Sequence, residues 1–101
     1  MKKFILLFVR LHQPDLKTQR QRGGQWMSAL PEGTVLDGFA FEAVGKLVGK
    51  HAILDDTAEG RDFGGAMILQ ALSFEEALRI AQGSPHVAMG GEILVKPFDL
   101  M

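Results

Sequence analysis

The stretch GGAMILQALSFEEALRIAQG, residues 64–83, carries the clearest fold signals in the chain. Residues from about Ala66 to Ala71 are largely apolar at successive positions, which is typical of a strand covered on both faces. Ser73 and Glu76 then form a capping-box pattern, whose side chains satisfy backbone amides at the start of a helix. Apolar residues follow at the spacing i, i+3, i+4 and i+7, and Gly83 predicts the end of the helix. The stretch therefore predicts a buried strand followed by an amphipathic helix.

Two further strands are predicted near the ends of the chain. Residues from about Lys3 to Arg10 include six consecutive apolar side chains, which point alternately to both faces of a strand and need a cover on each. Residues from about Glu92 to Phe98 place Ile93 and Val95 on one face. Pro97 marks the end of this strand or an edge of the sheet.

The segment His12-Gln13-Pro14-Asp15 is expected to be a loop that leads into the first helix. Gly23-Gly24 is expected to interrupt this helix, since each glycine costs about 1 kcal/mol relative to alanine in a helix interior. The better-supported part is Gln25 to Leu30, because Trp26 and Leu30 share one helical face at the spacing i, i+4. The basic residues before the glycines are most simply a solvated helix face.

A second strand is predicted from about Lys46 to Leu54, whereas residues 34–45 show no clear period. The order of elements becomes strand, helix, strand, strand, helix, strand, which is the split βαβ pattern of the ferredoxin-like α+β sandwich. Right-handed crossovers place both helices on one face of the antiparallel sheet. We expect residues 1–101 to form a single domain of this kind.

The opposite face of this sheet has no cover within one chain. Because the first and third strands are apolar on both faces, the bare face requires an apolar partner. A second copy related by a twofold axis is the simplest such partner. The sequence therefore predicts a homodimer paired through the sheet face.

The composition excludes several classes of protein. The 101 residues are 47% hydrophobic, which is enough to build a core, and their net charge of −1 lacks the cationic field that nucleic acid or an anionic membrane requires. No stretch approaches the roughly 20 apolar residues of a membrane span. The chain has no cysteine, hence no disulfide framework or thiolate site, which fits a reducing cytoplasm.

Four short motifs occur in an order that resembles the YCII-related family, the small dimeric α-β barrel proteins also named after a DGPF motif. They are GGAMI (64–68), LSFEEA (72–77), SPHV (84–87) and ILVKPF (93–98). The resemblance implies a ferredoxin-like protomer, a dimer formed through the sheets, and a cleft near the helices and strand ends that has been proposed to be enzymatic.

The chain departs from this family pattern at three places, one of which is Ser84-Pro85, where the family often has an Asp-Pro pair after the second helix. The DGPF segment would fall near Asp55-Asp56-Thr57-Ala58, where no Gly-Pro-Phe is present. Some members carry a first-helix histidine proposed as catalytic, whereas residues 14–31 contain no histidine. The resemblance thus implies the fold without implying an inherited activity.

His51 is the candidate catalytic residue, because imidazole exchanges a proton near neutral pH. Asp55 is its candidate partner on the same face of the predicted strand. Four residues of an extended strand span about 13 Å, so the two side chains meet only if the strand bends. The alternative is a surface or interface histidine.

Four more residues are candidate ligand-binding groups. Arg10 and His12, at the end of the first strand, could meet a ligand anion at the mouth of a cleft. Trp26 could form an apolar wall for a ring-containing ligand, or belong to the core. His86 follows Pro85 in a loop, a position at which functional groups are often displayed.

Neither a metal site nor a cofactor is predicted. The three histidines are far apart in sequence, and no pair has the close spacing that anchors a metal. The chain contains no G-x-G-x-x-G for a dinucleotide and no complete phosphate loop.

Two function classes stay open. The first is a cofactor-independent enzyme that acts on a small organic substrate in a cleft between sheet and helices. The second is a non-catalytic protein that binds a small molecule in the same cleft, or serves as an accessory protein. Fold alone does not separate them, because function resides in the site.

Overall fold

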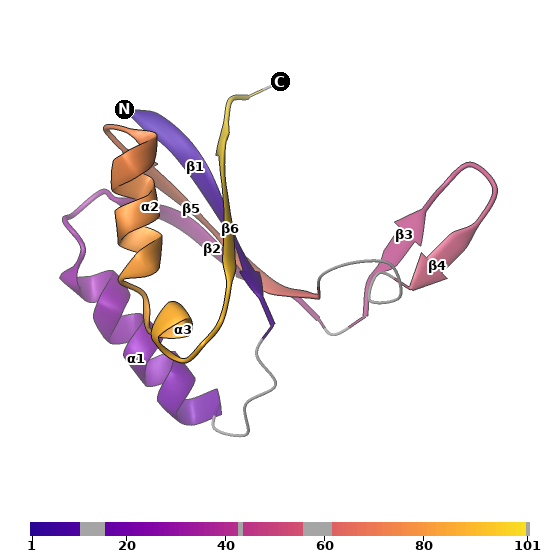
Figure 1. Cartoon of the computed structure of the whole chain (residues 1–101), viewed down its shortest axis with the longest axis horizontal. Helices are drawn as coiled ribbons and strands as arrows, with labels where there is room; N and C mark the ends of the chain where they lie inside the picture. The colour runs from indigo at the N-terminus through magenta and orange to yellow at the C-terminus, as the bar shows by residue number, and fades with distance from the viewer. Residues whose placement is uncertain (11–15, 43, 56–61, 101) are drawn as a thin grey trace.

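The computed structural model describes residues 1–10, 16–42, 44–55 and 62–100. In this part of the chain the elements are, in order, β1 (Lys2–Val9), α1 (Leu16–Ala29), β2 (Val35–Ala40), β3 (Lys46–Val48), β4 (Ile53–Asp55), β5 (Phe63–Ala71), α2 (Phe74–Gln82), α3 (Pro85–Ala88) and β6 (Ile93–Phe98). Figure 1 shows one sheet with helices beside it and a separate hairpin, β3–β4, that projects away from both.

The main sheet has the strand order β2-β5-β1-β6, with antiparallel pairing throughout. In the register of the central strands, Leu6 of β1 lies between Met67 of β5 and Val95 of β6. This order and the sequence of helices are those of the ferredoxin-like split βαβ fold. The predicted α+β class is confirmed, and so are the strands at the two ends of the chain and before α2.

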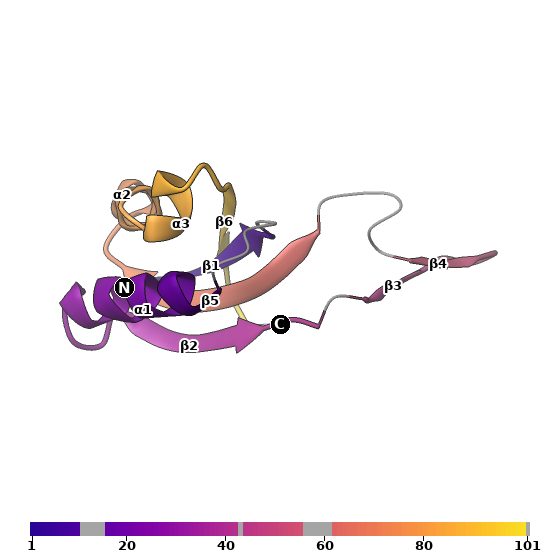
Figure 2. The ribbon, with the colours of Figure 1, turned by 90° about the horizontal axis from the view of Figure 1, so that it is seen from below.

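The helices cover one face of this sheet, as Figures 1 and 2 show. Side chains that alternate along β1 and β5 point toward α2, and with it they form the core: Phe4, Leu6, Met67, Leu69, Ala71, Ala77 and Ala81. Trp26 of α1 and Ile80 of α2 pack against this cluster from the helical layer. Burial of these large side chains supplies the main driving force for the fold.

Helix α2 begins as the capping box predicts. The Oγ of Ser73 accepts a hydrogen bond of 3.2 Å from the amide of Glu76. The carboxylate of Glu76 accepts a hydrogen bond of 2.9 Å from the amide of Leu72. In the standard capping box the donor is the amide of the N-cap residue, which here is Ser73. Ser84 caps a further short helix, α3, through a 3.3 Å bond from the amide of Val87.

The prediction that Gly23-Gly24 interrupts the first helix is wrong. Helix α1 runs from Leu16 to Ala29 and continues through Gly23 and Gly24. A Cβ at either glycine would meet nothing within 4 Å, so no close contact explains the glycines. Tertiary packing outweighs their low helix propensity, because Trp26 anchors the helix on the core.

The predicted strand from Lys46 to Leu54 is also wrong. It is a hairpin, in which Gly49 donates to the carbonyl of Ala52 at 2.8 Å across the turn between β3 and β4. The second strand of the main sheet is β2, within the segment that shows no clear period. An irregularity between Val35 and Asp37 breaks its alternation, which removes the pattern on which such a prediction depends.

Candidate functional site

A cavity of about 700 Å³ lies between the sheet and helices α1 and α3, at the end of the sheet where β1 stops. Its apolar lining includes Phe8, Trp26, Met27, Met67 and Met89. Its polar lining includes Arg10, Gln19, Arg20, Ser84 and His86. A predominantly apolar cavity with a few polar groups is the usual form of a small-molecule site.

Small residues on the sheet leave the space for this cavity. Gly65 of β5 pairs with Ala40 of β2 and with Phe8 of β1, and Gly38 pairs with Met67. Because side chains alternate along a strand, Gly38, Ala40 and Gly65 occupy positions that face the helices. Elsewhere in the sheet, positions of this kind carry large core side chains. The cavity therefore follows from the strand sequences as well as from the placement of the helices.

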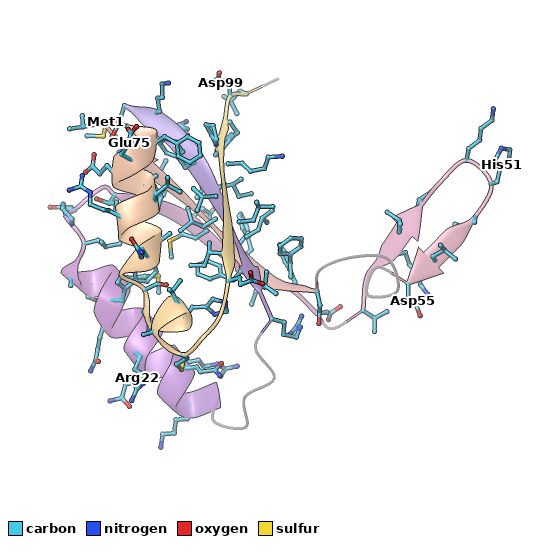
Figure 3. All side chains as sticks on the ribbon, viewed as in Figure 1. Met1, Arg22, His51, Asp55, Glu75 and Asp99 are labelled. Carbon is cyan, nitrogen blue, oxygen red and sulfur yellow. The ribbon has the colours of Figure 1, made fainter. Side chains whose placement is uncertain are left out.

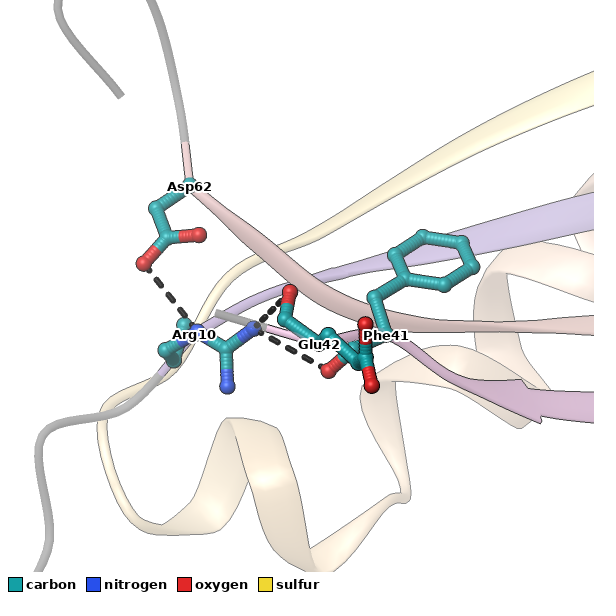
Figure 4. Close-up of polar contacts among 4 residues, drawn as sticks. All are labelled: Arg10, Phe41, Glu42 and Asp62. Carbon is teal, nitrogen blue, oxygen red and sulfur yellow. Dashed lines mark hydrogen bonds and ion pairs between the residues drawn. The ribbon is translucent and has the colours of Figure 1, made fainter. Parts of the chain in front are cut away.

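Arg10 sits at the edge of the cavity and joins three strand ends (Figure 4). Its Nε lies 3.1 Å from Oδ2 of Asp62, just before β5. One terminal nitrogen, Nη2, donates at 3.3 Å to each of the carbonyls of Phe41 and Glu42, just after β2. The other, Nη1, donates to no group in the described part of the chain. Arg10 is thus held in place, and two of its N–H groups have no partner among the residues that the structure describes.

His86 is positioned by α3 and by the loop that follows it. Its Nε2 lies 3.2 Å from the carbonyl oxygen of Glu92. Its ring meets that of Phe8 edge-on, with centroids 5.3 Å apart and an interplanar angle of 88°. Gly91 makes room for this ring, since a Cβ there would lie 2.5 Å from Nε2. His86 is therefore a partly buried imidazole with a fixed orientation beside the cavity.

Gln19 contributes an unsatisfied polar group. Its side-chain nitrogen is buried and has no hydrogen-bond partner among the residues that the structure describes. Such a group costs free energy unless something bonds to it, and Gln19 lines the cavity. Nothing in the sequence distinguishes Gln19, because it is one polar side chain in the polar stretch before the two glycines. Gln19 lies seven residues before Trp26, and α1 continues through the glycines between them, so the two side chains share one face of the helix.

The structure brings three of the predicted site residues together. Arg10, Trp26 and His86 all line the cavity. His12 lies outside the described residues.

The two remaining candidates lie on the hairpin, away from the cavity (Figure 3). His51 is exposed in the turn rather than on a strand, and Asp55 ends β4. The carboxylate of Asp55 pairs with the ammonium of Lys46 at 2.6 Å. No hairpin residue lines the cavity. The catalytic role of His51 and Asp55 stays a prediction.

Two broader features of the described chain bear on function. No helix there is long and apolar enough to cross a membrane. Within the same residues, no group of three or more histidine or acidic side chains is arranged to hold a metal ion.

Comparison with known proteins gives a likeness of fold. No protein-family model matches the chain, and no curated protein gives a significant match. Among solved structures, the chain is similar to 5-chloro-2-hydroxyhydroquinone dehydrochlorinase from Burkholderia phenoliruptrix AC1100, determined in complex with 2,5-dihydroxybenzoquinone. The match covers 100% of this chain and 96% of that chain, with a TM-score of 0.57 and 16% sequence identity. At this identity the similarity supports a common fold.

Proposed function

We propose that this chain is a YCII-related homodimeric protein that binds a small, flat organic anion in the cavity between its sheet and helices α1 and α3. The observation that carries the proposal is that two donor groups with no partner among the described residues border one apolar cavity. These are Nη1 of Arg10 and the buried side-chain nitrogen of Gln19.

The ligand class follows from the lining. A guanidinium recognises a carboxylate or another oxygen anion through paired N–H groups. Trp26, Phe8 and the methionines offer apolar surface that suits a planar ring. The dehydrochlorinase of the same fold was determined with 2,5-dihydroxybenzoquinone, an oxygenated ring of this kind. A hydroxylated aromatic acid or hydroxyquinone is therefore the proposed ligand class.

Homodimerisation is the second part of the proposal, and the free face of the sheet supports it. Register places Ile5 and Leu7 of β1, Ile68 of β5 and Leu94 of β6 on the face opposite the core. Leu94 is 43% exposed in the single chain. An apolar sheet face of this kind favours a partner, and a twofold pairing covers both copies.

Trp26 provides the test of ligand binding, because it is the single tryptophan of the chain. Titration with 2,5-dihydroxybenzoquinone and with 2,5-dihydroxybenzoate is expected to quench its fluorescence saturably. The quinone itself absorbs light, which can lower the fluorescence without binding. Calorimetry does not depend on this absorbance and gives the stoichiometry, which is expected to be one ligand per chain. Failure of both ring anions to bind saturably would contradict the proposed ligand class.

Substitution of the cavity arginine sharpens this test. Arg10→Met is expected to weaken binding about tenfold or more, since a hydrogen bond to a charged group contributes about 1.5–3 kcal/mol. Asp62→Asn is the matched control, because it removes the ion pair at the strand end but leaves the guanidinium. Equal losses of affinity in the two variants would indicate a role of Arg10 in structure alone.

A second candidate function is cofactor-independent proton transfer on the bound compound, favoured by the fixed imidazole of His86 beside the cavity. Incubation with the ligands found above, followed by mass spectrometry, separates the two. Conversion that is lost in His86→Gln and kept in His51→Gln supports an enzyme with His86 as its base. Recovery of every ligand unchanged supports a binding protein.

A further inference from the structure

We propose that the β3–β4 hairpin is an arm that lies against the second copy of the chain, so that the two subunits of the dimer exchange arms. The arm comprises residues 44–55. This inference rests on the proposed homodimer and adds a second contact surface to the sheet face.

Among the described residues, strands β3 and β4 pair with each other in a sheet of their own, apart from the main sheet. None of the arm's residues is buried, and its apolar side chains are widely exposed, Val48 to 72% and Ile53 to 66%. Figure 1 shows it projecting away from the sheet and helices. A two-stranded hairpin is at best marginally stable in water without a hydrophobic surface to pack on. A cover from a second chain would stabilise the arm.

Each face of the arm carries one exposed apolar cross-strand pair. Leu47 pairs with Leu54, and Val48 pairs with Ile53 in the next position, so the two pairs point to opposite faces. A hairpin that faces solvent on one side shows polar residues on that side. In the arm the Lys46–Asp55 ion pair shares its face with Val48 and Ile53, yet an apolar pair is exposed on each face. This favours a ribbon that packs against another surface.

The size of the molecule agrees with an exchanged arm. Its accessible surface is 7384 Å², against about 5,700 Å² for a compact monomer of this mass. Its radius of gyration is 14.6 Å, against about 12.7 Å for a compact chain of this length. The excess surface is about twice the roughly 800 Å² that each partner buries in a standard interface. A single chain thus exposes enough additional surface for a stable dimer.

The arm continues the free face of the sheet, which favours a second copy as its partner. Phe39 pairs with Ala66 on that face and is 48% exposed. Phe41, at 42%, follows β2, and Val44, the first residue of the arm, is 67% exposed. A twofold axis through the sheet faces would let each arm meet the same surface on the other subunit.

Charge argues against an anionic membrane as the partner. Lys46 is neutralised by Asp55 on the arm itself, which leaves Lys50 as its other lysine. Binding to an anionic lipid surface typically requires a cluster of 4–8 basic residues.

Sedimentation analysis of arm variants tests the proposal. The double variant Val48→Asp/Ile53→Asp is expected to raise the dimer dissociation constant about tenfold or more, because two carboxylates would be buried at the interface. Leu72→Asp is the control, since Leu72 is 74% exposed and follows β5 outside the arm. Circular dichroism and thermal unfolding should show the core of both variants intact.

Three outcomes are informative. A weakened dimer in the arm variant with an unchanged control supports the exchange. An unchanged dissociation constant overturns the arm inference and leaves the sheet-face dimer standing. A wild-type chain that stays monomeric at micromolar concentration overturns both, while ligand binding in the cavity is still tested separately by Trp26 fluorescence.

Cross-linking locates the arm directly, because the chain contains no cysteine to interfere. A photo-reactive group attached to a single cysteine in the variant Val48→Cys should react with the other subunit. A mixture of ¹⁴N- and ¹⁵N-labelled chains distinguishes cross-links between copies from those within one copy. Cross-links within single chains alone would overturn the proposal.

Discussion

The guanidinium of Arg10 and the carboxylate of Asp62 meet at 3.1 Å and join the end of β1 to the residue that precedes β5. Both side chains are about three-quarters shielded, with 27% and 24% of their surfaces exposed. The same guanidinium bonds the two carbonyls after β2. One side chain therefore holds three strand ends around the mouth of the cavity.

Arg10→Met is expected to lower the free energy of unfolding by about 1–2 kcal/mol, because it removes the ion pair and both carbonyl contacts together. Asp62→Asn should cost less, since the carbonyl contacts are kept. Urea unfolding followed by circular dichroism gives both values. A loss in Asp62→Asn equal to that in Arg10→Met would show that the carbonyl contacts add nothing.

A second prediction concerns the close approach of β2 and β5. A Cβ at Gly65 would lie 2.6 Å from the carbonyl oxygen of Phe39, a backbone atom that cannot move aside without shifting β2. Gly65→Ala is therefore expected to destabilise the fold by about 1–3 kcal/mol. Gly64→Ala is the neighbouring control, because its nearest contacts, to Arg10, are at 3.5 Å. Equal stability of the two variants would contradict the close approach.

Helix α1 yields a prediction of opposite sign. Gly24 lies within the helix with open space around its Cβ position. Gly24→Ala should raise the free energy of unfolding by about 0.5–1 kcal/mol, through higher helix propensity and a less flexible unfolded chain. Thermal unfolding checks this. A destabilised variant would show that Gly24 meets a neighbour, such as the second subunit, that the single chain lacks.

The fold could be predicted where local signals agree with the final packing. The capping box of α2 and the apolar runs of β1 and β5 are such signals, because local propensity and burial favour the same element there. The low helix propensity of its two glycines predicts a break in α1, but the packing of Trp26 on the core outweighs that propensity. β2 carries no strand signal, because an irregularity removes its alternation, and the apolar residues of the exposed arm predict a strand in its place.

The site was only partly visible for a related reason. Arg10, Trp26 and His86 stand out by residue type and by their place at a strand end, on a helix face or in a loop. Gln19 carries no such signal, and its role depends on the length of α1. The cavity is created by small residues that lie side by side on β2 and β5. Their pairing, such as that of Ala40 with Gly65, can be predicted only if β2 is recognised as a strand.

The last prediction concerns the proton on His86. A carbonyl oxygen only accepts hydrogen bonds, so the 3.2 Å contact with Glu92 requires that Nε2 carries the proton. In the neutral imidazole Nδ1 is then the unprotonated nitrogen, as a general base requires. Long-range ¹⁵N–¹H spectra of the three histidines should show the Nε2–H form for His86. The Nδ1–H form would contradict the contact.

Gly91→Ala should disturb this arrangement selectively. A Cβ at residue 91 would lie 2.5 Å from Nε2 of His86 and 2.8 Å from its carbonyl oxygen, so the ring must leave its contact with Glu92. The imidazole signals of His86 are expected to shift, whereas those of His51, on the arm, should stay unchanged and serve as an internal control. If the cavity ligand contacts His86, its affinity should fall in the same variant. Unaltered His86 signals would show that the loop can yield around the new methyl group, and that Gly91 does not fix the imidazole.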